Sequence, residues 1–163
     1  MNNGQSNGQG KEDGLSPERP MMMRGVRGAT TVENDDADEV LEATRELLTM
    51  LVRVNKIEVD DIASIVLTTT DDLGSTYPAF AARQLGWFDV ALLCSNEMNV
   101  PDGLSHCIRV LIHWNTTKAP KDIGHVYLRK AKSLRPDRDN IPPIRPVQMN
   151  NMEAAMKVLA HNR

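Results

Sequence analysis

Cys107-Ile-Arg-Val-Leu-Ile-His-Trp114 is the stretch of sequence that decides the fold of this chain. Its alternation is typical of a half-buried strand, which we expect over residues 108–116. Arg109 interrupts the apolar pattern, and a guanidinium inside such a strand costs desolvation energy unless an anion meets it. The sequence leaves two partners open for Arg109: Glu97, in an internal ion pair, or a bound ligand.

Composition limits the classes of protein that the chain can belong to. Its 163 residues suffice for one domain with a core. A net charge of -3 and 4% aromatic residues give no sign of a nucleic-acid surface. No apolar run approaches the roughly 20 residues of a membrane helix, and no secretory signal is visible. Cys94 and Cys107 are too far apart for a CxxC unit, so we expect a reduced, cytoplasmic compartment.

The ends of the chain differ in composition from its middle. Residues 1–20 are rich in Gly, Asn, Gln and Ser, and we expect a disordered polar leader. Residues 21–137 carry the predicted domain. Residues 138–163 begin as a proline-rich linker and end in a short helix or tail, because an isolated helix under about 12 residues is marginal.

The middle of the chain predicts alternating strands and helices. A first strand is expected over 21–31, and the acidic run 34–39 predicts a helix capped by Asn34 or Asp35 that continues to Asn55. Its buried stripe is predicted to contain Val40, Ala43, Leu47, Leu48, Leu51 and Val54. The later elements are a strand over 60–70, a helix through Leu85 that begins at Tyr77-Pro78, a strand over 88–94, the strand over 108–116, and a strand pair over 125–128 and 131–135. This order predicts an α+β (or α/β) domain with one mixed β-sheet and helices packed on one face.

Five short segments carry a further signal. They are Arg24-Gly-Val-Arg27-Gly-Ala-Thr-Thr-Val-Glu33, Cys94-Ser-Asn-Glu97-Met98, Cys107-Ile-Arg109-Val110, His125-Val-Tyr127-Leu128 and Leu134-Arg135-Pro136. In this order and spacing they resemble the monofunctional chorismate mutases of the small trimeric α/β class, not the all-helical class. The resemblance covers residues 21–137, and its opening segment is the most specific part.

The resemblance implies a homotrimer whose sheets form a pseudo-barrel. It also implies a cofactor-free enzyme that rearranges chorismate to prephenate in phenylalanine and tyrosine synthesis. This pericyclic reaction needs no nucleophile and no proton transfer, so at least about 10⁶-fold, or ~8 kcal/mol, must come from conformational restriction and electrostatics. Negative charge grows on the ether oxygen and positive charge on the ring, so a fixed cation and a fixed anion would bind the transition state best.

The resemblance also implies roles for individual residues. Arg109 would be the cation beside the ether oxygen, while Glu97 and the Cys94 thiol would hold the ring hydroxyl. The substrate-binding residues would be Arg27 and Tyr127 for the side-chain carboxylate, Arg135 for the other carboxylate, the backbone of Leu93, Ser95 and Asn96, and Tyr77, Ala79 and Arg83 from a neighbouring subunit. In this arrangement Arg109 and Glu97 should stand apart, separated by a gap the size of the substrate.

The residues taken one by one have simpler explanations. Arg109 could be a structural arginine paired with Glu97, and a lone cysteine such as Cys94 is usually a small buried hydrophobe. The four histidines have no metal-ligand spacing. At the level of function, the same architecture could be a carboxylate-metabolite binding module without catalysis, or an imine deaminase that uses an arginine and an activated water.

Three positions depart from the family pattern. Leu93 stands where a hydroxyl residue is common, which removes one polar contact. Phe80 stands where a basic residue can occur, and Tyr77 replaces phenylalanine. None of these changes affects Arg27, Glu97, Arg109 or Tyr127.

Overall fold

The computed structural model describes residues 19–135. Of the predicted leader, only Arg19 and Pro20 fall inside this range, and both are exposed without regular structure. The predicted linker and tail over 138–163 lie outside it. The predicted boundary of the domain at residue 137 therefore stays a prediction.

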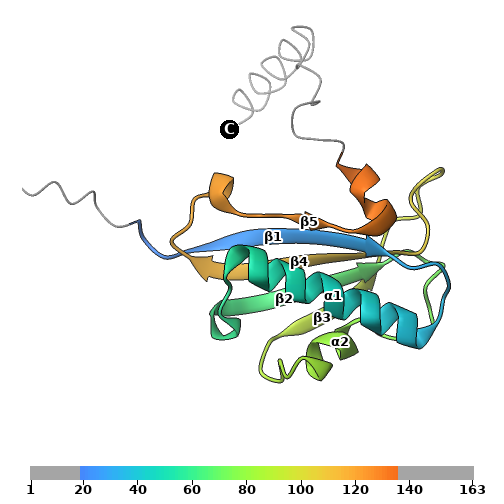
Figure 1. Cartoon of the computed structure of the whole chain (residues 1–163), viewed down its shortest axis with the longest axis horizontal. Coiled ribbons are helices and arrows are strands. Elements are labelled where there is room, and N and C mark those ends of the chain that lie inside the picture. Colours follow the sequence, from blue (N-terminus) through green and yellow to red (C-terminus); the bar gives the residue numbers. More distant parts are fainter. Residues whose placement is uncertain (1–18, 136–163) are drawn as a thin grey trace, which may run out of the picture.

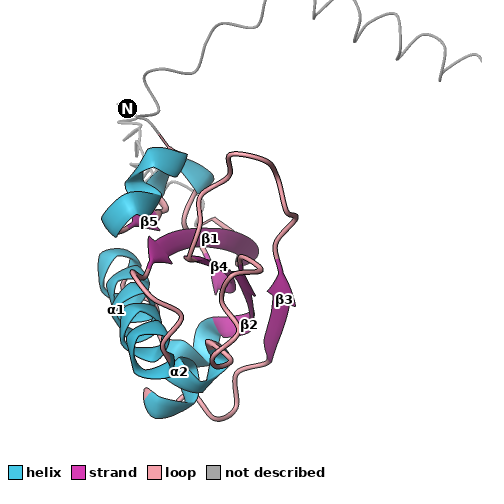
Figure 2. Ribbon diagram, turned by 90° about the vertical axis from the view of Figure 1, so that its right-hand side faces the viewer, coloured by secondary structure: helices cyan, strands magenta, loops and turns pink. Residues whose placement is uncertain are grey.

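One mixed sheet of five strands forms the framework, as predicted (Figure 1). The strands are β1 (Met22–Thr31), β2 (Ile62–Thr69), β3 (Leu92–Asn96), β4 (Cys107–Thr116) and β5 (Val126–Tyr127), in the order β3-β2-β4-β1-β5. The central strand β4 is antiparallel to both β1 and β2, whereas the outer pairs β2–β3 and β1–β5 are parallel. The helices α1 (Ala37–Asn55) and α2 (Ala79–Gln84) lie on the same side of the curved sheet (Figure 2). Short 3₁₀ helices occur at Val59–Asp61, Pro120–Asp122 and Arg129–Leu134.

The long helix α1 has sequence signals at both ends. Asp36 is its N-cap and accepts a hydrogen bond from the backbone of Glu39 at 3.0 Å, so the cap lies one residue beyond the predicted Asp35. The Asp35 carboxylate instead accepts hydrogen bonds from the backbone of Gly74 and Ser75, which fastens the helix start to the turn after β2. At the other end Lys56 is in the left-handed conformation and closes the helix.

The core lies between α1 and the sheet. Leu47, Leu48 and Leu51 of α1 are fully buried against one face of the sheet. Gly28 of β1 permits this contact, because a Cβ there would lie 2.8 Å from Leu51 Cδ1. The predicted stripe is wrong at Val54, which is 51% exposed, because the next residue, Asn55, takes the buried position and donates hydrogen bonds to the carbonyls of Leu51 and Gly124.

Two predicted strands differ from the structure. β3 begins at Leu92 rather than residue 88, because Arg83 donates hydrogen bonds to the carbonyls of Trp87 and Phe88 and holds them in the turn after α2. The predicted strand over 131–135 is wrong, since residues 131–134 belong to the 3₁₀ helix Arg129–Leu134. Arg129 turns the chain with a φ of 49° and donates to the carbonyl of Thr31 at 3.0 Å, which ends the pairing of β5 with β1.

Candidate active site

The face of the sheet away from the helices carries one row of side chains that crosses all five strands. Strand pairing aligns Tyr127 of β5 with Ala29 of β1, Ala29 with Arg109 of β4, Arg109 with Thr68 of β2, and Thr68 with Ser95 of β3. Directly paired residues point to the same side of a sheet. The row therefore places a phenol, a guanidinium and two hydroxyls on one surface, with the small Ala29 between the first two.

A cavity of about 280 Å³ opens along this row. Arg27, Glu97, Arg109 and Tyr127 all line it, together with Thr68. Arg27 lies two residues before Ala29 on the same strand face, and Glu97 lies two residues beyond Ser95. Four of the residues predicted from the sequence as site residues are thus brought together by the sheet. Two positive charges, one negative charge and a phenol suit a small, multiply charged anion better than an apolar ligand.

Arg109 and Glu97 form an ion pair, so the prediction that they stand apart is wrong for this structure. Arg109 Nη1 lies 3.4 Å from Glu97 Oε2, and the two side chains are 36% and 19% exposed. The pair forms because Glu97 follows β3 and is bound through its backbone N–H to the carbonyl of Thr69, at 2.8 Å. Only β2 separates the carboxylate from the strand of Arg109, a distance that two long side chains can span.

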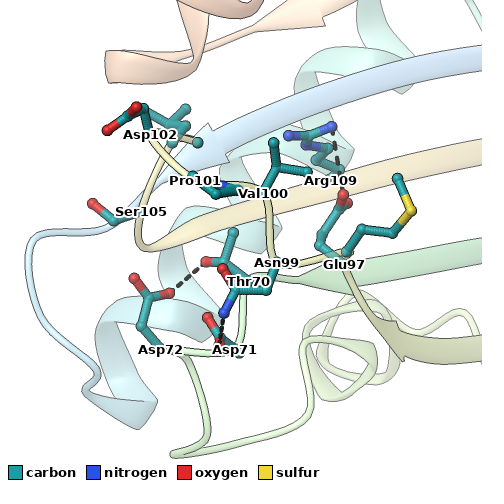
Figure 3. Close-up of a pocket in the computed structure, with 13 residues that line it drawn as sticks. Thr70, Asp71, Asp72, Glu97, Asn99, Val100, Pro101, Asp102, Ser105 and Arg109 are labelled. Atoms are coloured by element: carbon teal, nitrogen blue, oxygen red, sulfur yellow. Dashed lines mark hydrogen bonds and ion pairs between the residues drawn. The ribbon is translucent and has the colours of Figure 1, made fainter.

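A second hollow, of about 380 Å³, adjoins the first (Figure 3). Its wall is the loop 97–105 together with Thr70, Asp71 and Asp72, and it shares Arg109 and Glu97 with the first cavity. Figure 3 shows the Arg109 and Glu97 side chains pointing toward one another at one end of this hollow, with Asp71 and Asp72 at the other. The ion pair consequently lies between two open spaces rather than in packed core.

Two polar atoms of this site are buried without a hydrogen-bond partner in the described part of the chain: Arg109 Nε and the Tyr127 hydroxyl. Buried polar groups nearly always have partners, and an orphaned one calls for a functional or structural explanation. Both residues line the same cavity. Both side chains therefore place an unpaired donor within the wall of this cavity.

Comparison with known proteins identifies the family of this chain. A family model for chorismate mutase type I matches residues 23–138. The chain belongs to this family. It is similar to chorismate mutase AroH from Thermus thermophilus, at 46% identity over 120 residues that cover 73% of this chain and 98% of the relative. It is also similar to chorismate mutase AroH from Bacillus subtilis (strain 168), at 44% identity over 118 residues, or 72% of this chain and 93% of the relative. Among solved structures, a chorismate mutase from Clostridium thermocellum matches with a TM-score of 0.67 and 50% identity, covering 68% of this chain and 98% of that one.

The resemblance seen in the sequence is therefore confirmed at the level of the family and of its fold. The matched region of the type I chorismate mutase family contains the predicted site residues Arg27, Glu97, Arg109 and Tyr127. Their individual roles stay predictions, and the structure adds where each one lies.

Cys94 is not brought to the row of site residues. It pairs with Leu67 on β2, which is fully buried, and its side chain packs at the margin of the main core on the helix side of the sheet. The thiol on the Arg109 face is Cys107, two residues earlier on β4. Cys107 is fully buried, and its burial raises the pKa of the thiol, so it stays neutral.

The backbone predicted to line the site follows β3. Leu93 and Ser95 project on the same face as the row, whereas Asn96 ends the strand. Ser95 and Asn96 are exposed, and Leu93 is 63% exposed despite being apolar. The edge of the site along β3 is therefore open on its outer side.

The residues predicted to come from a neighbouring subunit lie apart from this chain's own cavity. Tyr77 and Phe80 stack edge to face at 6.1 Å at the start of α2 and are both exposed. Ala79 packs against the main core, and the Arg83 guanidinium is bound to carbonyls of the following turn. None of these residues lines the two cavities around Arg109.

Arg135 is the last residue that the structure describes, and it is half-buried. It directly follows Leu134, which lines the cavity with Tyr127. Arg135 is therefore adjacent in sequence to a residue of the cavity wall, and it ends the part of the chain that the structure describes.

Thr68 is the site residue that the sequence analysis missed. Its hydroxyl donates a hydrogen bond to Glu97 Oε1, and it stands next to Arg109 across the β2–β4 pair. The available signal was the alternation of β2, which sets Ser64, Val66 and Thr68 on the face that Arg109 occupies in β4. A threonine among other threonines in Thr68-Thr69-Thr70 gave no reason to single it out.

Asp72 anchors the loop that walls the second hollow. Its carboxylate accepts hydrogen bonds from the Thr70 hydroxyl and from the backbone of His106, at 2.9 Å to the nearer oxygen. Thr70 Oγ1 in turn accepts from the backbone of Cys107 at 2.9 Å. Burial opposes ionisation of Asp72, but these hydrogen bonds lower its pKa below the usual value. The network fixes the start of β4, and with it the position of Arg109.

Proposed function

We propose that this chain catalyses the rearrangement of chorismate to prephenate, in the synthesis of phenylalanine and tyrosine. The observation that carries the proposal is the meeting of Arg27, Glu97, Arg109 and Tyr127 around one cavity in a member of the type I chorismate mutase family. A dianionic substrate with a ring hydroxyl fits two guanidiniums, a phenol and one carboxylate.

Arg109 is the cation for the breaking bond. In the concerted shift the ether C–O bond breaks while a C–C bond forms, and negative charge grows on the ether oxygen. A rigid donor at that oxygen binds the transition state more strongly than the substrate. Arg109 is held on the central strand β4, and its buried Nε has no partner among residues 19–135. Both features favour this role.

Glu97 supplies the opposite charge. Its carboxylate would accept the ring hydroxyl and face the ring, where positive charge develops. The present contact with Arg109 does not oppose this role, because a single, half-exposed contact of 3.4 Å contributes only about 0–1 kcal/mol. That cost is small beside the ~8 kcal/mol or more of transition-state stabilisation that an enzyme supplies. Substrate can therefore replace the pair.

The two carboxylates of the substrate have separate partners in this proposal. Arg27 and the Tyr127 hydroxyl would bind the side-chain carboxylate, and Arg135 the other one. Arg27 is exposed and lies just before the part of β1 that pairs with β5, where its backbone N–H donates a hydrogen bond to His125 Nδ1 at 3.0 Å. Cys94 contributes through its backbone rather than its thiol, since its side chain packs on the helix side of the sheet.

The working form of the protein is proposed to be a homotrimer. The sheet face that carries the site lies opposite α1 and α2 (Figure 2). The 3₁₀ helix Arg129–Leu134 packs on its β1 end through Ala131, whereas Leu93 is exposed at its β3 end. In a closed trimer, the site face of one subunit would pack against the α2 end of the next, which would bury apolar surface and bring Tyr77, Ala79 and Arg83 of one subunit to the cavity of another. Light scattering behind a sizing column should give three times the chain mass. Leu93→Asp should lower that mass, and a monomeric wild-type protein with full activity would contradict the trimer.

A cytoplasmic location is part of the same proposal. Both cysteines of the chain are free thiols, as expected in a reducing compartment. Within residues 19–135, no helix is long and apolar enough to cross a membrane.

The decisive experiment follows the ultraviolet absorbance of chorismate with purified protein and identifies prephenate as the product. Saturable decay that needs no added cofactor is the expected result. No decay above background, together with tight binding of a prephenate-like dianion, would instead indicate a binding module. Hydrolysis of a reactive imine without chorismate turnover would indicate a deaminase.

A further inference from the structure

Thr68 occupies the position between the two charges of the site. On β2 it is paired directly with Arg109 of β4 on one side and with Ser95 of β3 on the other. Its side chain is half-buried and lines the same cavity as Arg109 and Glu97. Among residues 19–135, no other hydroxyl lines that cavity besides the phenol of Tyr127. Thr70 and Ser105 line the second hollow, but it is the Thr68 hydroxyl that is hydrogen-bonded to the ion pair.

The two oxygens of the Glu97 carboxylate are used differently. Oε1 accepts a hydrogen bond from the Thr68 hydroxyl, and Oε2 contacts Arg109 Nη1 at 3.4 Å. A guanidinium and a carboxylate that are free to pair frequently form two parallel hydrogen bonds of about 2.7–2.9 Å. Here only one contact is made, it is longer than that range, and Arg109 Nε is buried without a partner in the described chain. The pair is therefore incomplete on the side where Thr68 holds the carboxylate.

We propose that Thr68 is a positioning residue that keeps Arg109 and Glu97 from closing into a two-point salt bridge. By holding Oε1, its hydroxyl leaves Arg109 Nε free for the ligand and fixes the Glu97 carboxylate at the other side of the cavity. The inference rests on the proposed function, because the reaction requires the cation and the anion to act on different parts of the substrate. Without the hydroxyl, the two charges would neutralise one another and the substrate would have to separate them.

The variant that tests the inference is Thr68→Val. Valine keeps the β-branched shape that suits a strand and removes only the hydroxyl. A hydrogen bond to a charged group corresponds to roughly a 10- to 100-fold effect, so we expect kcat/KM to fall by about that factor. Thr68→Ser keeps a hydroxyl at the same position and should stay within about threefold of wild type. Thr68→Ala serves as the second hydroxyl-free variant if the valine protein does not fold.

A double-mutant cycle with Glu97→Gln separates positioning from general structural support. If Thr68 acts through the Glu97 carboxylate, Thr68→Val should change kcat/KM by less than about threefold in the Glu97→Gln background. An equal loss in both backgrounds would overturn the inference, since it would mean that valine disturbs the strand itself. So would a valine variant with wild-type kinetics.

A second readout does not depend on activity. Crystal structures of wild type and Thr68→Val should differ in the Arg109–Glu97 geometry, with two contacts of about 3 Å, one of them from Nε, only in the variant. A single long contact in both proteins would overturn the inference even if the wild type turned over chorismate. If the wild type does not turn over chorismate, the proposed function fails, while the structures still decide the role of Thr68.

Discussion

Replacement of Arg109 by alanine is the substitution that tests the proposed chemistry most directly. The loss of a donor to a developing oxyanion typically costs about 10²–10³ in kcat, or ~2.7–4 kcal/mol. We expect Arg109→Ala to lower kcat by at least about 10²-fold, because the unpartnered Nε is buried and bulk water cannot readily substitute for it. Arg109→Lys should restore little of the lost kcat, since a compact ammonium does not offer the rigid fork of donors that a guanidinium presents to both Glu97 and the substrate.

The same substitution should affect folding far less than catalysis. The Arg109–Glu97 contact is single and the arginine is 36% exposed, so losing it should lower the free energy of unfolding by about 1 kcal/mol or less. Thr68 remains to bind the Glu97 carboxylate in the variant. A large fall in kcat with a small change in stability is thus the signature expected of a catalytic arginine.

The assay combines chorismate decay under saturating substrate with urea unfolding of each variant. Arg53→Ala is the matched control, since Arg53 is an exposed arginine in the last turn of α1 and lies far along the chain from the site residues. It should retain activity within about twofold, as surface substitutions away from special features have small effects. Near wild-type kcat in Arg109→Ala, or a loss of stability of several kcal/mol with unchanged kcat, would refute the assignment.

Three other substitutions test separate parts of the structure. Tyr127→Phe should raise KM about tenfold if the hydroxyl binds a substrate carboxylate, and unchanged KM would count against the contact. The same variant should not destabilise the fold, because this buried hydroxyl has no protein partner between residues 19 and 135. Leu51→Ala should lower the free energy of unfolding in urea by about 2–5 kcal/mol, because Leu51 is fully buried against the sheet; a loss under about 1 kcal/mol would contradict that packing. The hydrogen bonds that lower the pKa of Asp72 stabilise the fold above the unfolded-state pKa of about 4, and that contribution is lost as the pH falls through the folded-state value. Urea unfolding between pH 2 and pH 7 (roughly) should therefore show a weaker acid dependence in Asp72→Asn than in wild type, and identical pH profiles would argue against the network.

The sequence alone determined the framework of this protein. Alternation in 107–116, the helical stripe of α1 and the order of the elements predict a mixed sheet with helices on one face, and the structure confirms it. These features depend on local periodicity, which can be read directly from the sequence. The family also followed from short segments, among them Arg24–Glu33 and Cys107–Val110, and the family match confirms it.

Local signals failed where a distant partner decided the outcome. The segment 131–135 was predicted as a strand, but Arg129 bonds to Thr31 and turns the chain into a 3₁₀ helix. Val54 fits the helical stripe, yet it stays exposed, because Asn55 takes the buried position and is hydrogen-bonded to Gly124. In both places the answer depends on contacts between residues far apart in sequence.

Only the tertiary structure decided how the charges of the site are arranged. Register between strands puts Thr68 next to Arg109, brings Glu97 within 3.4 Å of the guanidinium, and turns the Cys94 side chain to the other face. A shift of one residue in pairing would reverse these faces, and no periodicity in a single strand specifies it. The sequence could name Arg109 and Glu97 as the important charges. Whether they meet, and which hydroxyl stands between them, was decided by the way in which three strands align.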